Sequence, residues 1–62
     1  MTLAEKLRAA CVDYWRHRNT PGEYRMRLAS ERLYRVAEAY RAGWTLAMVE
    51  EVDGEAMGEV GG

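Results

Sequence analysis

The segment 19–22, with the sequence Asn-Thr-Pro-Gly, constrains the fold of this chain more than any other. Pro21 is the only proline among 62 residues, and five of the six glycines lie after residue 42. Proline removes a backbone donor and glycine frees the φ angle, so the segment interrupts any regular element. The stretches on either side, 1–18 and 23–42, contain neither residue. We therefore expect two helices joined at this point.

The first stretch has the pattern of an amphipathic helix. Thr2 and Glu5 have capping-box spacing, in which the hydroxyl accepts a backbone N–H and the carboxylate accepts one in return. At 100° per residue the apolar residues form one broad stripe, with charged residues opposite. We expect a helix over 2–18 with an inner face formed by Leu3, Leu7, Ala10, Cys11, Tyr14 and Trp15.

The second stretch predicts a helix over 20–42. Thr20 fits the N-cap, and Glu23 completes a second capping box. Gly43 suits the left-handed turn that ends many helices, and Trp44 would then fold back on the last turn. Apolar residues recur at steps of three and four and define the expected inner face, formed by Met26, Ala29, Leu33, Val36, Ala37 and Tyr40.

The remainder of the chain allows two interpretations. Segment 45–52 is either a short helix capped by Thr45 or a strand that turns back at Asp53-Gly54. We favour the helix, because apolar residues recur every three positions and most residues are helix formers. Residues 53–62 hold four glycines and three acids, so we expect a flexible Gly/Glu-rich tail.

These elements predict an all-α fold with one helical domain over 1–52, built on an antiparallel helical hairpin. A chain of 62 residues has a thin core, and an isolated hairpin leaves one side of each apolar stripe in water. We therefore expect a homodimer with a four-helix arrangement. The residues expected in its core or dimer interface are Leu7, Cys11, Tyr14, Trp15, Met26, Leu33, Val36, Tyr40 and Trp44.

The residue types needed for catalysis or metal binding are scarce. Cys11 is the only cysteine and His17 the only histidine, which excludes a disulfide framework and a zinc site closed by this chain alone. The two lie about 240° apart around one helix, so they do not meet as nucleophile and base. Adjacent Glu50 and Glu51 point about 100° apart, with no further ligand nearby in sequence. We predict a protein that is not an enzyme, with no catalytic residue, metal or cofactor.

A group of aromatic and basic residues lies off the main stripe of the second helix. Tyr24, Leu28 and Tyr34 alternate there with arginines. Tyr and Arg beside an aliphatic side chain are the composition favoured at protein interfaces. This pattern predicts a small interaction or regulatory protein, an adaptor or inhibitor that binds a larger protein. The predicted partner-binding residues are Tyr24, Arg25, Arg27, Leu28, Arg32, Tyr34 and Arg35.

Nucleic-acid binding is the alternative. Ala39, Val49 and Val52 stand around Gly43 at the packing spacings of a helix-turn-helix motif. All nine Lys and Arg lie in residues 1–41, against five acids. Residues 42–62 hold five acids and no base, so the expected recognition helix would repel phosphates. Protein binding is therefore preferred.

The membrane is not expected to be a partner. No apolar run approaches the ~18 residues of a membrane span. Lys6 and Arg8 follow Leu3 without the apolar core of a signal peptide. These features predict a cytoplasmic protein.

Overall fold

The computed structural model describes residues 1–61 and forms three helices in that range, with no strand. α1 spans Leu3–Arg16, α2 spans Glu23–Arg41 and α3 spans Leu46–Gly61. The all-α prediction is confirmed. The radius of gyration is 11.2 Å, close to the ~11 Å expected of a compact chain of this length.

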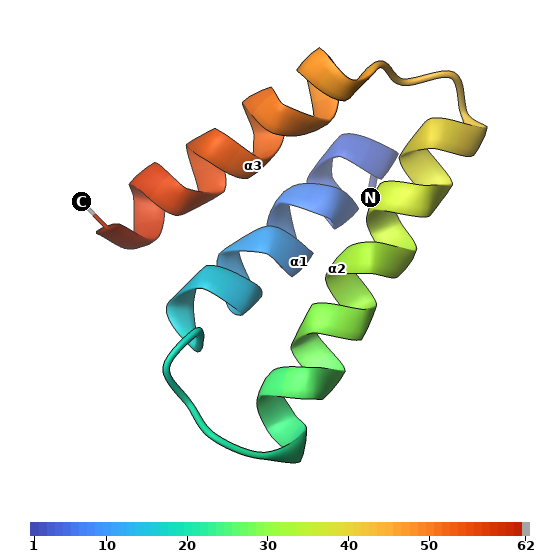
Figure 1. Cartoon of the computed structure of the whole chain (residues 1–62). Helices are drawn as coiled ribbons and strands as arrows, with labels where there is room; N and C mark the ends of the chain where they lie inside the picture. The colour runs from blue at the N-terminus through green and yellow to red at the C-terminus, as the bar shows by residue number, and fades with distance from the viewer. Residues whose placement is uncertain (62) are drawn as a thin grey trace.

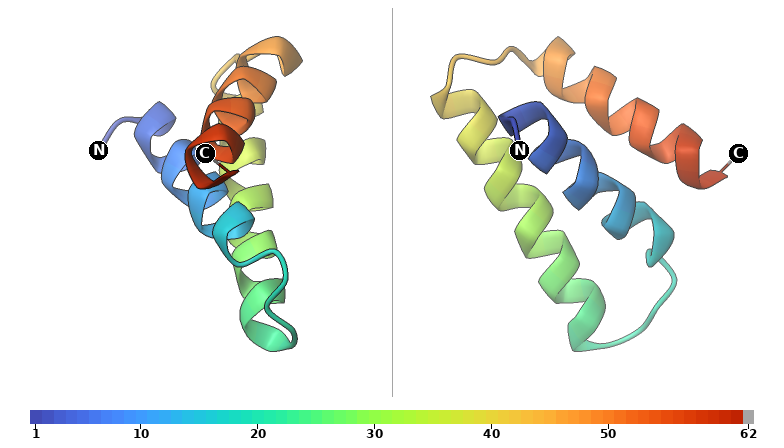
Figure 2. Two further views of the ribbon diagram at one scale, coloured as in Figure 1. Left: turned by 90° about the vertical axis from the view of Figure 1, so that its left-hand side faces the viewer. Right: turned by 180° about the vertical axis from the view of Figure 1, so that it is seen from behind.

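α1 is the central helix of the arrangement. It packs against both α2 and α3, whereas α2 and α3 make few contacts with each other. Figures 1 and 2 show the two outer helices diverging from their connecting loop, with α1 between them. The core therefore lies along α1. None of the helices in residues 1–61 is both long and apolar enough to cross a membrane.

The start of α1 confirms the predicted capping box. The backbone N–H of Glu5 donates to Thr2 Oγ1 at 3.1 Å, and the backbone N–H of Thr2 donates to Glu5 Oε1 at 2.9 Å. The helix ends at Arg16, two residues before the expected end, and His17 is its C-cap. The backbone N–H of His17 donates to Asp13, which satisfies one of the last carbonyl groups.

The start of α2 differs from the prediction. The N-cap is Gly22 rather than Thr20, and it makes no side-chain capping bond. Its φ of 90° is one that glycine adopts without strain. Thr20 and Pro21 lie before the helix instead of forming its N-cap and first turn. Residues 17–22 are all used to connect the two helices, so the second capping box does not form.

The end of α2 confirms the expected glycine turn. Gly43 has a φ of 94°. Its N–H donates to the carbonyl of Tyr40, and the N–H of Trp44 donates to the carbonyl of Ala39, both at 3.0 Å. These two bonds form a Schellman motif. Trp44 is thereby directed back onto the molecule, where it packs against the core.

α3 corrects the expectation of a short helix followed by a flexible tail. The helix continues through the segment expected to be flexible, as far as Gly61, and Gly62 lies outside the described residues. Its start agrees with the prediction, because Thr45 Oγ1 accepts the N–H of Met48 at 3.3 Å. Val49 and Ala56, two turns apart, are both buried and anchor both halves of the helix. The strand alternative does not form.

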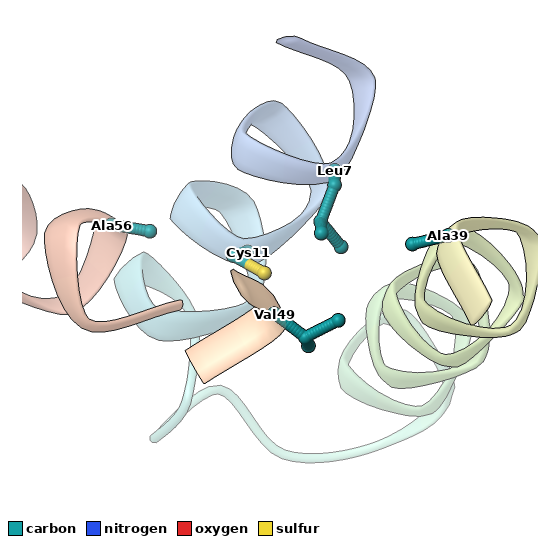
Figure 3. Packing of buried hydrophobic residues seen from close by; sticks show 5 residues of the cluster. All are labelled: Leu7, Cys11, Ala39, Val49 and Ala56. Carbon is teal, nitrogen blue, oxygen red and sulfur yellow. The ribbon is translucent and has the colours of Figure 1, made fainter. Parts of the chain in front are cut away.

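The buried core is small and draws on all three helices (Figure 3). Leu7 and Cys11 of α1 are fully buried. Around them lie Ala39 from α2 and Val49 and Ala56 from α3. Small alanine side chains at two of these positions allow the outer helices to approach α1 closely.

The orientation of α2 divides the predicted apolar stripe. Met26, Leu33 and Tyr40 were predicted to lie in the core or the dimer interface; 69%, 62% and 44% of their surfaces are exposed in the single chain, whereas Val36 packs against the core. The buried residue of α2 is Ala39, and half-buried Arg32 lies on the same side. By helical spacing this side is roughly 120° from the predicted stripe. A small residue and a paired arginine fit the narrow space beside α1 better than three large apolar side chains.

Candidate functional site

A cluster of polar and aromatic side chains joins the three helices. Trp15 Nε1 donates to Asp53 Oδ1 at 2.9 Å. The guanidinium of Arg32 forms an ion pair with the same oxygen, with NH2 at 3.0 Å and Nε at 3.2 Å. Its carbon Cζ lies 5.0 Å from the ring centre of Tyr14 and 5.9 Å from that of Trp15. One carboxylate thus holds α1, α2 and α3 together.

The electrostatics of this cluster favour a charged Asp53. Burial alone would raise the pKa of its carboxyl, but the Trp15 hydrogen bond and the Arg32 charge outweigh burial and lower the pKa. The ion pair is half-buried: 23% of the Arg32 side chain and 20% of the Asp53 side chain are exposed. The pair is therefore less screened by water than a surface salt bridge.

The side chains most suited to nucleophilic or acid–base chemistry are engaged in packing. Burial, followed by the negative charge of Asp53, raises the pKa of the Cys11 thiol to about 11. A thiol with this pKa is neutral at pH 7 and a poor nucleophile. The His17 ring packs edge-on against Tyr24 at 5.2 Å between centres. Within residues 1–61, no three His, Cys, Asp or Glu residues are grouped as metal ligands.

The predicted partner-binding residues are divided between different surroundings. Tyr24, Arg25, Arg27 and Tyr34 are exposed on α2, whereas Leu28 is half-buried and Arg32 belongs to the interhelical cluster. Arg35 is also engaged, in ion pairs with Glu31 at 3.3 Å and Glu38 at 3.0 Å. Its guanidinium lies 5.2 Å from the ring centre of Tyr34. The seven residues therefore do not form one free surface.

A different surface of α2 is both apolar and exposed. Met26, Leu33 and Tyr40 recur every seven residues and point away from the core; we call these three residues the outer stripe. Beside its N-terminal end lies an open pocket of about 370 Å³. The pocket is lined by Tyr14, Gly22, Arg25, Met26 and Ala29.

The sequence interpretation missed Asp53, the central residue of the cluster. It was assigned to the start of the tail, so its environment was not considered. A signal was available in the spacing, because Val49, Asp53, Ala56 and Val60 follow one another at steps of four, three and four. An acid on the apolar face of a helix requires a buried partner. Extending the helix beyond Val52 would have revealed this requirement.

Exposed charges are divided between two parts of the molecule. The end formed by the α1–α2 loop holds the exposed arginines Arg16, Arg18, Arg25 and Arg27. α3 carries four exposed glutamates, Glu50, Glu51, Glu55 and Glu59, of which Glu59 forms an ion pair with Arg8 of α1 at 2.9 Å. The helix in the position of a helix-turn-helix recognition helix is therefore acidic and contains no Lys or Arg.

Compared with models of protein families, with curated proteins and with solved structures, the chain shows no significant match. The proposals below therefore rest on its own sequence and geometry.

Proposed function

We propose that this chain is a non-enzymatic interaction protein that binds another protein through the outer stripe of α2. The supporting observation is the orientation of that helix. Its large apolar residues Met26, Leu33 and Tyr40 face solvent, although the molecule has only a small core. Large apolar side chains aligned along one exposed side of a helix are typical of a site where another helix packs.

The spacing of the outer stripe selects the kind of partner. Residues seven apart lie on one side of a helix and match the seam along which two helices pack. The surface is convex and narrow, because a single helix provides it. An amphipathic helix with its own apolar stripe fits such a surface, whereas an extended peptide would need a free sheet edge. The partner is therefore a protein that presents an amphipathic helix.

The neighbouring side chains are suited to the rim of such an interface. Tyr34 and Arg27 are exposed beside the outer stripe. Aromatic and arginine side chains are enriched where proteins bind one another. Two of the predicted partner-binding residues thus flank the outer stripe, and the centre of the proposed binding surface is Leu33.

Site-specific photocross-linking in the native host tests this function. A photoreactive residue in place of Leu33 should produce adducts with a protein, and the adduct should map to a helical segment with apolar residues at heptad spacing. The matched control is the same probe at Ala9, which is exposed on the far side of α1. Adducts at position 33 that are no more frequent than at position 9 would contradict the proposal.

Nucleic-acid binding is the second candidate, and the cluster of exposed arginines around the α1–α2 loop favours it. Such a cluster can neutralise several phosphates. The acidic α3 opposes it, because its glutamates would repel the same phosphates. A probe at exposed Asn19 in this loop should then give adducts that nuclease treatment removes, while position 33 gives none above the Ala9 control, which would also contradict protein binding.

A further inference from the structure

The outer stripe of α2 has a near-symmetric arrangement about its central residue. Met26 and Tyr40 lie seven residues before and after Leu33, while Ala29 and Val36 lie four before and three after it. If two copies of α2 pack antiparallel with Leu33 at the centre, Met26 of each copy lies opposite Tyr40 of the other. Ala29 then lies level with Val36, whose side chain is half-buried against the monomer's own core, so this pair lies at the edge of the contact.

The charges beside the outer stripe complement one another in the same arrangement. Glu23 and Arg41 are eighteen residues apart and project from α2 at the same angle, about 80° to one side of the stripe. Antiparallel packing places Glu23 of each copy beside Arg41 of the other. Both are exposed, and neither takes part in the ion pairs formed within residues 1–61.

The opposite side of the stripe adds a second complementary contact. Arg25 projects about 80° to that side and would lie near Gly43 of the other copy, at the C-terminal end of its α2. Carbonyl groups at a helix C-terminus carry partial negative charge that favours a cation. Parallel packing would instead place the two Arg41 residues on opposite sides of the seam, where neither meets a carboxylate, and only Glu23 would find a partner, Arg25 of the other copy. Only antiparallel packing gives Glu23, Arg41 and Arg25 a complementary contact each. The charges therefore select the antiparallel direction.

From this complementarity we propose that the outer stripe binds the outer stripe of a second copy, with the two α2 helices antiparallel. The proposal rests on the proposed function, because it names the helix that occupies the same surface. Tyr40 of the second copy would lie at the pocket beside Met26 and Ala29. α3 packs mainly against α1 (Figure 2), and the outer stripe of α2 is exposed in the single chain.

The size of this interface sets the expected affinity. A helix of 19 residues is about 28 Å long, and one such helix buries less than the ~800 Å² per partner typical of stable complexes. An interface below the standard size belongs with weak, transient contacts, so we expect a dissociation constant at the micromolar end of the range, on the order of 10 μM.

A charge-swap experiment tests both the partner and the direction. In a dimer of Glu23→Arg, each contact between positions 23 and 41 would bring two arginines together. In a dimer of Arg41→Glu, each of these contacts would bring two glutamates together. An equimolar mixture of the two variants restores opposite charges at both contacts. Sedimentation equilibrium should show the wild type as a dimer, each variant weakened about tenfold, and the mixture recovering most of the lost affinity.

The mixture provides its own control for folding. Each substitution places an unfavourable charge at one end of α2 and weakens the helix through its dipole. This effect is the same in the single-variant sample and in the mixture, so only a contact between copies explains a gain in affinity on mixing. Circular dichroism should show all samples equally helical. A mixture no tighter than the single variants would overturn the antiparallel dimer, as would a wild type that remains monomeric at about 100 μM, roughly ten times the expected dissociation constant. If position 33 still cross-links to another protein in that case, the proposed function stands and only self-association fails.

Discussion

At the residue scale, Asp53 is the side chain on which the arrangement of the helices most depends. Its carboxylate accepts from Trp15 and pairs with Arg32, so it connects α3 to both other helices. α2 and α3 make few other contacts. Removing one partner of a half-buried pair leaves the other partly desolvated and without a counter-charge, which costs more than losing a surface ion pair.

The pH dependence of stability should report on this contact. The pKa of Asp53 is lowered by folding, so its stabilisation is fully present above the unfolded pKa of about 3.9 and is lost as pH falls through the lower folded value. Asp53→Asn should reduce the free energy of unfolding by about 1–2 kcal/mol at pH 7. Urea unfolding of both proteins from pH 7 to pH 2 should show this difference shrinking only below about pH 4. A difference that does not change with pH would contradict the assignment.

At the element scale, the features that could be predicted from sequence are those fixed by short-range chemistry. The capping box at Thr2, the glycine turn at Gly43 and the cap at Thr45 all depend on residues within a few positions of each other. The all-α class follows from the same local signals and from apolar periodicity.

Features that depend on how the helices meet could not be predicted locally. The start of α2 is set by the distance that the loop 17–22 must cover, and its rotation is set by the small Ala39 and the Arg32 pair. Counting apolar residues did not reveal that Ala39 and Arg32, rather than Met26, Leu33 and Tyr40, face the other helices of the chain, because burial follows shape and pairing as well as hydrophobicity. The length of α3 was missed because its glycines suggested disorder, whereas Val49 and Ala56 fix it against α1.

Glycine substitutions test whether α3 extends through its second half. Gly54 and Gly58 lie inside the helix, and a β-carbon at either position would meet no atom within 4 Å apart from those of the adjacent helix backbone. Replacing both with alanine should raise the free energy of unfolding by about 1–2 kcal/mol, because alanine favours helix over the unfolded chain. Thermal or urea unfolding measures the change.

The contrasting control for that experiment is Gly43→Ala. Gly43 has a positive φ, so an added β-carbon should strain the turn and lower stability by about 1 kcal/mol. No gain in stability from the double substitution in α3 would indicate that residues 53–61 are not held as helix.

At the scale of the whole molecule, the small core and the exposed apolar face of α2 are related, because the large apolar side chains of α2 point away from the core. Among residues 1–61 six apolar residues are buried, and three of them are alanines. The large side chains of the outer stripe contribute little to this core, so folding and binding use different faces of α2. A change at the stripe should therefore affect association and leave the monomer folded.

The central claim is that α2 turns Leu33 outward and Ala39 inward, and one comparison of two substitutions tests it most directly. The free energy of unfolding of Leu33→Asp and Ala39→Asp should be measured in urea at about 1 μM, below the expected dissociation constant of the dimer. Leu33→Asp should change stability by less than about 0.5 kcal/mol, because the side chain is exposed. Ala39→Asp should cost several kcal/mol, roughly the penalty of burying an unpaired carboxylate, and should unfold the chain. The reverse order, with Leu33→Asp unfolded and Ala39→Asp stable, would contradict the account.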